Sequence, residues 1–124
     1  MKSLSAQLGV ILLVAGLTIC SSEVWGADWK QFAEATTGVF RYDAASINSP
    51  SQGLVRVWIN NVTKNETTHV ELKCKDRSYQ VLSAIQWDST YRIKSREDYY
   101  DYPGDWLKIS PRSVPEALHE IVCP

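Results

Sequence analysis

The sequence has little of what nucleic-acid binding, metal binding or nucleotide chemistry requires. Its 13 Lys and Arg residues are balanced by 14 Asp and Glu residues, so the net charge is -1 at pH 7. A nucleic-acid-binding domain carries an excess of basic residues on one face, so no DNA or RNA partner is expected. The chain also lacks a Cys-x-x-Cys pair, a zinc-ligand spacing, a glycine-rich phosphate loop and a Gly-x-Ser-x-Gly motif. No catalytic residue, metal or cofactor is therefore predicted.

No apolar run is long enough to cross a membrane as a helix. Leu8 to Ile19 is almost unbroken apolar sequence, but it covers only about a dozen residues, whereas a spanning helix needs roughly 20. Lys2 precedes this run and polar residues follow it, as is typical of a secretory signal peptide. Signal peptidase needs small side chains at the last and third-last positions before the cut, and Val24-Trp25-Gly26 fits this tolerably if cleavage follows Gly26. Residues 1–26 are therefore predicted to be a signal peptide, and residues 27–124 a single exported domain.

Cys20 offers a second processing route. Leu17-Thr18-Ile19-Cys20 is similar to a bacterial lipobox, in which the cysteine is acylated and anchors the protein to a membrane. The position before that cysteine normally holds a small residue, and Ile19 is bulky and branched. Cleavage after Gly26 is therefore favoured, with lipidation of Cys20 as the alternative.

Cleavage after Gly26 leaves two cysteines, Cys74 and Cys123. In an oxidising compartment two such cysteines most simply form a disulfide. The bridge would close a loop of about 50 residues and stabilise the domain by roughly 4 kcal/mol. Two free reactive thiols are the alternative, which the absence of a Cys-x-x-Cys or Cys/His setting disfavours.

The first half of the exported part is predicted to form strands. Residues 29–33 and 39–42 are apolar and aromatic segments separated by a Thr-Thr-Gly turn, which predicts a hairpin. Residues 54–59 have the highest β-branched and aromatic content. A polar connection, residues 60–68, leads to a strand at 69–75. Its alternation points Val70, Leu72 and Cys74 toward the core.

The strands that follow complete an antiparallel meander. Asp76-Arg77 is a tight turn into residues 79–87, where Tyr79, Val81, Ile85 and Trp87 are predicted to share one face. A second turn at residues 88–90 leads to a short strand at 91–94. One apolar face of this sheet must then be covered.

The C-terminal segment is predicted to be the helix that covers it. Ser113 and Glu116 form a capping box, in which each side chain bonds the backbone amide of the other. Apolar residues recur on one face, namely Val114, Ala117, Leu118, Ile121 and Val122, and leave Glu116, His119 and Glu120 outward. The predicted fold class is α+β, an antiparallel β-sheet meander covered by a C-terminal α-helix, with one disulfide.

Several short motifs together resemble the bacterial surface-adhesin protein E family. They are Asp28-Trp29-Lys30, Tyr42-Asp43, Val55-Arg56-Val57-Trp58, Glu71-Leu72-Lys73-Cys74, Tyr79 with Val81-Leu82-Ser83, Trp106, Ser113-Val114-Pro115-Glu116-Ala117-Leu118 and Val122-Cys123. The resemblance covers nearly the whole exported part. It implies a small envelope protein of Gram-negative bacteria, in the periplasm or at the outer-membrane surface, with a sheet and a terminal helix tied by the cysteines. The adhesin that names the family is an outer-membrane lipoprotein that engages host proteins.

The two histidines suggest no chemistry. His69 alternates outward on a strand and His119 lies on the polar side of the helix, each without a nucleophile or carboxylate at a recognisable spacing. Both are interpreted as solvated surface residues.

The segment 97–106 is unusual in composition, because four acids are interleaved with three tyrosines and a tryptophan. Such residues give rigid amphipathic contact area at protein-binding surfaces. The candidate binding residues are Tyr99, Tyr100, Asp101, Tyr102 and Trp106. The alternatives are a solvated loop whose tyrosines pack back on the sheet, and a calcium site at Asp98, Asp101 and Asp105, whose spacing departs from the EF-hand pattern.

The leading functional hypothesis is a non-enzymatic, adhesion-type binding module of the bacterial envelope. Its expected partner is another protein, of the host or of the envelope itself. A soluble periplasmic ligand carrier or enzyme inhibitor on the same scaffold is the alternative, and a hydrolase with scattered site residues is a third.

The mass of the purified protein tests the processing. After expression from the full sequence in a Gram-negative host, we expect the mass of residues 27–124 less two hydrogens, without acyl groups. Intact-protein mass spectrometry measures both. A chain that begins at an acylated Cys20 would contradict the predicted cleavage, and a mass without the loss of two hydrogens would contradict the disulfide.

Overall fold

The computed structural model describes residues 27–124. The predicted signal peptide, its cleavage site and Cys20 fall on residues 1–26, outside the described residues, so their processing stays a prediction.

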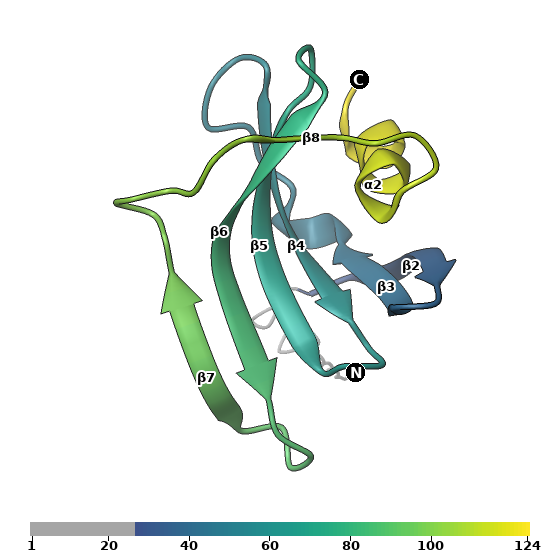
Figure 1. Cartoon of the computed structure of the whole chain (residues 1–124), viewed down its shortest axis with the longest axis vertical. Coiled ribbons are helices and arrows are strands. Elements are labelled where there is room, and N and C mark those ends of the chain that lie inside the picture. Colours follow the sequence, from purple (N-terminus) through teal and green to yellow (C-terminus); the bar gives the residue numbers. More distant parts are fainter. Residues whose placement is uncertain (1–26) are drawn as a thin grey trace, which may run out of the picture.

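The described chain forms one antiparallel sheet (Figure 1). Its strands are β2 (Trp29–Ala35), β3 (Gly38–Asp43), β4 (Leu54–Asn61), β5 (Glu66–Lys73), β6 (Ser78–Trp87), β7 (Ile93–Asp98) and β8 (Leu107–Lys108). The order β2-β3-β4-β5-β6-β7 follows the chain, which confirms the predicted meander. A short 3-10 turn, η2 (Ala44–Ser46), follows β3. β8 pairs with residues 78–79 of β6 and β7 with residues 83–87, so both lie along the same edge of β6.

The helix α2 (Val114–Val122) packs on one face of the sheet, as predicted (Figure 1). The core beneath it consists of Val57, Val70, Leu72, Ile109 and Leu118. Fully burying one such side chain contributes about 1.5 to 3 kcal/mol. Ile121 was expected in this apolar stripe, but its side chain is 45% exposed because the helix contacts the sheet around Leu118.

The N-terminus of α2 is capped on one side as predicted. Ser113 is the N-cap, and its hydroxyl accepts a hydrogen bond of 3.2 Å from the amide of Glu116. The Glu116 carboxylate was expected to return to the Ser113 amide, but it accepts from the Arg112 amide at 2.7 Å instead. Its other oxygen pairs with Arg77 at 3.0 Å, which ties the helix to the β5–β6 turn.

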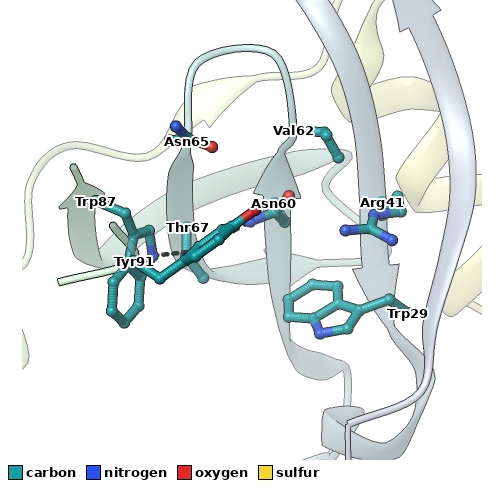
Figure 2. Close-up of a pocket in the computed structure, with 8 residues that line it drawn as sticks. All are labelled: Trp29, Arg41, Asn60, Val62, Asn65, Thr67, Trp87 and Tyr91. Atoms are coloured by element: carbon teal, nitrogen blue, oxygen red, sulfur yellow. Dashed lines mark hydrogen bonds between the residues drawn. The ribbon is translucent and has the colours of Figure 1, made fainter. Parts of the chain in front are cut away.

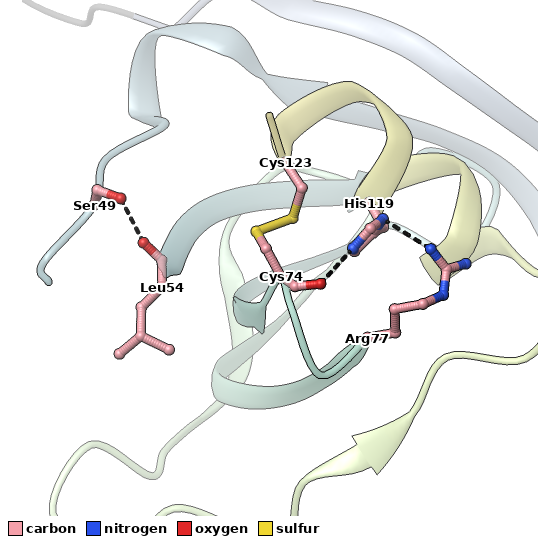
Figure 3. Close-up of a disulfide and its surroundings, with 6 residues drawn as sticks. All are labelled: Ser49, Leu54, Cys74, Arg77, His119 and Cys123. Atoms are coloured by element: carbon pink, nitrogen blue, oxygen red, sulfur yellow. Dashed lines mark hydrogen bonds between the residues drawn. A yellow bond between two sulfur atoms is a disulfide. The ribbon is translucent and has the colours of Figure 1, made fainter. Parts of the chain in front are cut away.

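The disulfide between Cys74 and Cys123 is confirmed (Figure 3). Cys74 follows the last residue of β5, and Cys123 is the C-cap of α2, with 5.7 Å between their Cα atoms. His119 lies beside the bridge, and its Nε2 is 3.0 Å from the carbonyl oxygen of Cys74. His119 was expected to be solvated, but the helix turns it toward the end of β5, where it reinforces the same contact.

A β-bulge corrects the predicted faces of β6. Val81 lies opposite Val70, but the next partner pair is Ser83 with His69, so β6 holds one extra residue at Leu82. An extra residue reverses the alternation beyond it. Tyr79 and Val81 therefore face the helix, whereas Ile85 and Trp87 lie on the opposite face.

Two turns also differ from the sequence-based expectation. The β4–β5 connection is shorter than residues 60–68, because the strands extend to Asn61 and resume at Glu66. The expected strand at 91–94 begins two residues later, at Ile93. Tyr91 instead lies in a turn with φ of 62°, whose backbone is held by the Asp88 carboxylate.

Among residues 27–124, no helix combines the length and the apolar character that crossing a bilayer requires.

Removing the disulfide should destabilise the domain strongly. The bridge closes a separation of 49 residues, and the loop-entropy estimate for that length is roughly 4 kcal/mol. We expect the double variant Cys74→Ala/Cys123→Ala to lose a free energy of unfolding of that order, measured by urea denaturation. Ser49→Ala, outside the bridge, is the control. Equal midpoints for the double variant and the parent, with and without reductant, would contradict the stabilising role.

Candidate binding site

The face of the sheet opposite the helix carries four of the chain's five tryptophans, Trp29, Trp58, Trp87 and Trp106. Trp58 alternates with the buried Val57 along β4, so it points away from α2. The bulge in β6 sends Trp87 to the same side. No helix covers these tryptophans, and tryptophan is enriched at binding surfaces. We call this surface the helix-free face.

An aromatic stack occupies the middle of the helix-free face. The Trp58 and His69 rings are parallel within 4°, with centroids 4.5 Å apart. His69 Nδ1 is 2.6 Å from the hydroxyl of Tyr100. His69 is therefore half-buried and bonded, which corrects the expectation of a solvated residue. Burial chiefly, and then the positive charge of Arg56, lower the pKa of His69 below its ordinary value, while Glu71 acts in the opposite sense.

An ion pair between the buried Glu71 and the partly exposed Arg56 lies beside this stack. Glu71 lies between the core residues Val70 and Leu72, so it points to the helix-free face, yet it is only 4% exposed. Its two oxygens accept from Arg56 Nε at 2.7 Å and from Gln80 Nε2 at 2.9 Å. An unpaired buried carboxylate would cost several kcal/mol, so these two partners allow β5 to be buried on both faces.

The segment 99–106 is an excursion from an edge strand. β7 and β8 pair with the same edge of β6, so these residues leave the edge after Asp98 and return to it at Leu107. Trp106 anchors the return, because the Lys73 ammonium lies 4.4 Å from the centre of its ring. Tyr100 anchors the departure through His69.

The excursion divides the predicted binding residues. Tyr100, Asp101, Tyr102 and Trp106 belong to the excursion, and Tyr102 is 88% exposed. Tyr99, the first residue of the excursion, points to the other side, because it lies with Val81 and Ala84 toward the helix side, as Asp105 does, and donates to Glu97. Backbone alternation sends adjacent tyrosines to opposite faces.

The calcium alternative gains no geometric support. Asp98 is already bonded by Ser83 at 2.6 Å and by Arg96 at 3.1 Å. Among residues 27–124, no three His, Cys, Asp or Glu side chains gather where they could hold a metal ion.

The hydroxyl of Ser83, the strand partner of His69, is also occupied. Ser83 is fully buried and donates to Asp98, so it supports the base of the excursion. A nucleophile must be reachable by substrate and paired with a base. Ser83 donates to a carboxylate, but a substrate cannot reach this fully buried serine.

A pocket of about 460 Å³ lies at the other end of the helix-free face (Figure 2). Trp29, Trp87 and Tyr91 form its aromatic walls, and Arg41 and Asn60 supply polar groups. Sequence reasoning missed it, because the period of two assigned Trp87 to the core face. The available signal was the position of Trp58, which a period of two places opposite Val57.

The floor of the pocket is held by hydrogen bonds to Thr67. Its hydroxyl oxygen accepts from Trp87 Nε1 at 2.9 Å and from Asn60 Nδ2 at 3.1 Å. The indole is thereby fixed in orientation. The hydroxyl proton of Thr67 is left to donate.

Fold and site together define a disulfide-closed sheet domain that exposes an aromatic face suited to binding. The family model described as surface-adhesin protein E matches residues 29–124. The chain therefore belongs to the surface-adhesin protein E family, which confirms the resemblance seen in the sequence. No curated protein and no solved structure matches the chain.

Acidification should weaken the fold through His69. Because the pKa of His69 is lowered in the folded state, the unfolded chain binds more protons as the pH falls through 6.5. The stability contributed by neutral His69 is therefore present above pH 6.5 and is lost on acidification. We expect urea midpoints to fall between about pH 7.5 and 5.5, and less so in His69→Gln.

The carboxylates act in a different window. The backbone hydrogen bond from Arg92 lowers the pKa of Asp88 below its ordinary 3.8, and the hydrogen bond from Ser83 does the same for Asp98. The stability that these two ionised carboxylates contribute is therefore lost only at lower pH. An equal loss in His69→Gln and in the parent between about pH 7.5 and 5.5 would show that another group causes the change.

Proposed function

We propose that the protein is a non-enzymatic binding module of the bacterial cell envelope that recognises another protein through residues 99–106. Membership of the surface-adhesin protein E family supports an exposed, adhesin-like role. The observation that carries the assignment of the site is the excursion of these residues from the edge of β6, with Tyr102 88% exposed.

The excursion has the composition and rigidity of a recognition loop. Tyr100 and Trp106 fix its two ends on the helix-free face through His69 and Lys73. Anchored ends reduce the entropy lost on binding. Tyr102 and the acidic Asp101 lie between these ends and are exposed.

The charge of the excursion indicates the partner. Asp101 and Asp105 are exposed, and neither pairs with a Lys or Arg among the described residues. A surface with tyrosines and unpaired carboxylates favours a basic protein surface. The partner is therefore proposed to be a basic protein of the host or of the envelope.

Replacing the exposed tyrosines should remove the partner. In cross-linked pull-downs from envelope and serum with protein from the full sequence, Tyr100→Ala/Tyr102→Ala should retain at least about tenfold less of each captured protein. The control is Ile121→Ala, which removes a 45% exposed apolar side chain from the helix, away from both the excursion and the pocket. Unchanged capture by the double variant, or equal loss with Ile121→Ala, would refute the assignment to residues 99–106.

The compartment is tested separately. Sensitivity of the protein to protease on intact cells supports a surface role. Release by osmotic shock would favour the soluble periplasmic carrier or inhibitor instead.

A further inference from the structure

We propose that the pocket on the helix-free face binds a saccharide unit that carries a carboxylate. This site is separate from the segment 99–106, because it lies at the end of the sheet formed by the β4–β5 and β6–β7 turns (Figures 1 and 2). Its volume of about 460 Å³ falls within the 300 to 1,000 Å³ range, roughly, of small-molecule sites.

The first argument is the charge of the pocket. Arg41 is the one charged residue among the described residues that line it. No carboxylate of residues 27–124 forms an ion pair with Arg41, whereas Arg56, Arg77 and Arg96 each have one. The Nε of Arg41 is shielded from solvent and has no hydrogen-bond partner among the described residues. The shielded Nε cannot reach a ligand, but the two terminal nitrogens also have no hydrogen-bond partner among the described residues. An unpaired guanidinium at a pocket wall selects a carboxylate, which these two nitrogens can bind through parallel hydrogen bonds.

The second argument is the arrangement of the rings. Trp87 and Tyr91 lie on one side of the pocket and Trp29 on the other, with Arg41 beside Trp29 (Figure 2). The guanidinium carbon lies 6.0 Å from the centre of the Trp29 ring, so the indole supports the cation by a cation–π contact. A flat ring-shaped ligand placed between these walls would have its substituents directed at polar side chains.

The third argument separates a saccharide from an aromatic or lipid-like acid. Tyr91 is 80% exposed, so one wall of the pocket is open to water. A purely apolar ligand favours an enclosed apolar cavity. A sugar ring instead has an apolar C–H face, which packs on an aromatic ring, and a rim of hydroxyls. The Thr67 hydroxyl and the Asn60 side-chain carbonyl supply a donor and an acceptor for that rim.

Titration with matched small molecules tests the proposal. The protein expressed from the full sequence is titrated with methyl glucuronide, with the neutral methyl glucoside and with benzoate, by calorimetry and tryptophan fluorescence. We expect the glucuronide to bind at least about tenfold more tightly than either of the others. Equal binding of the glucoside, tighter binding of benzoate, or no binding of the glucuronide would each overturn the proposal.

Variants assign the binding to the pocket. Arg41→Gln should abolish the preference for the glucuronide, whereas Arg92→Gln, the charge-matched control, should preserve it. Tyr91→Ala removes an exposed wall without disturbing the core and should weaken both glycosides. Arg41→Gln binding like the parent, or equal loss in Arg92→Gln, would refute the site. Loss of glycoside binding with unchanged protein capture would distinguish this pocket from the segment 99–106.

The source of the sugar is read from two further titrations. Oligomers in which the uronate alternates with an N-acetylhexosamine represent matrix-type polysaccharides, and homopolymers of uronate represent microbial ones. Tighter binding of either oligomer than of the monosaccharide supports an extended glycan as the ligand. Weaker binding of both would confine the site to a free acidic sugar.

Discussion

A helix of nine residues can cover only part of one face of this sheet, and that mismatch of size governs the rest of the structure. At 1.5 Å per residue the helix is about 14 Å long, whereas six neighbouring strands span about 24 Å. The disulfide and the pairing of Arg77 with Glu116 fix the helix over the β2–β5 region. The second face must then be stabilised by side chains of the strands themselves.

The helix-free face differs between its middle and its end. In the middle of the sheet, Glu71 is buried with Arg56 and Gln80, and the excursion at 99–106 brings Tyr100 over His69. Nearer the β4–β5 and β6–β7 turns no segment of the described chain covers the face, and a tryptophan-walled pocket is left. The same lack of a second covering layer therefore accounts for both a rigid loop and an open pocket.

The two proposed sites differ in chemistry. The excursion presents tyrosine and aspartate to solvent, which suits a basic protein surface, whereas the pocket presents an unpaired arginine between aromatic rings, which suits an acidic sugar. The pocket lies on the helix-free face, and the excursion reaches that face through Tyr100 and Trp106.

Local patterns in the sequence were sufficient to predict the main elements of the fold. Alternation in β5, the helical repeat after Ser113 and the two remaining cysteines predicted the meander, the terminal helix and the disulfide, because each depends on neighbouring residues or on covalent chemistry. Only the tertiary structure decided which side Trp87 faces, since one extra residue at Leu82 reverses the alternation. The same holds for the contact of Tyr100 with His69, which lie 31 residues apart in the sequence. The pocket combines Trp29, Arg41, Asn60, Thr67, Trp87 and Tyr91, which are distant in sequence and meet only through strand register.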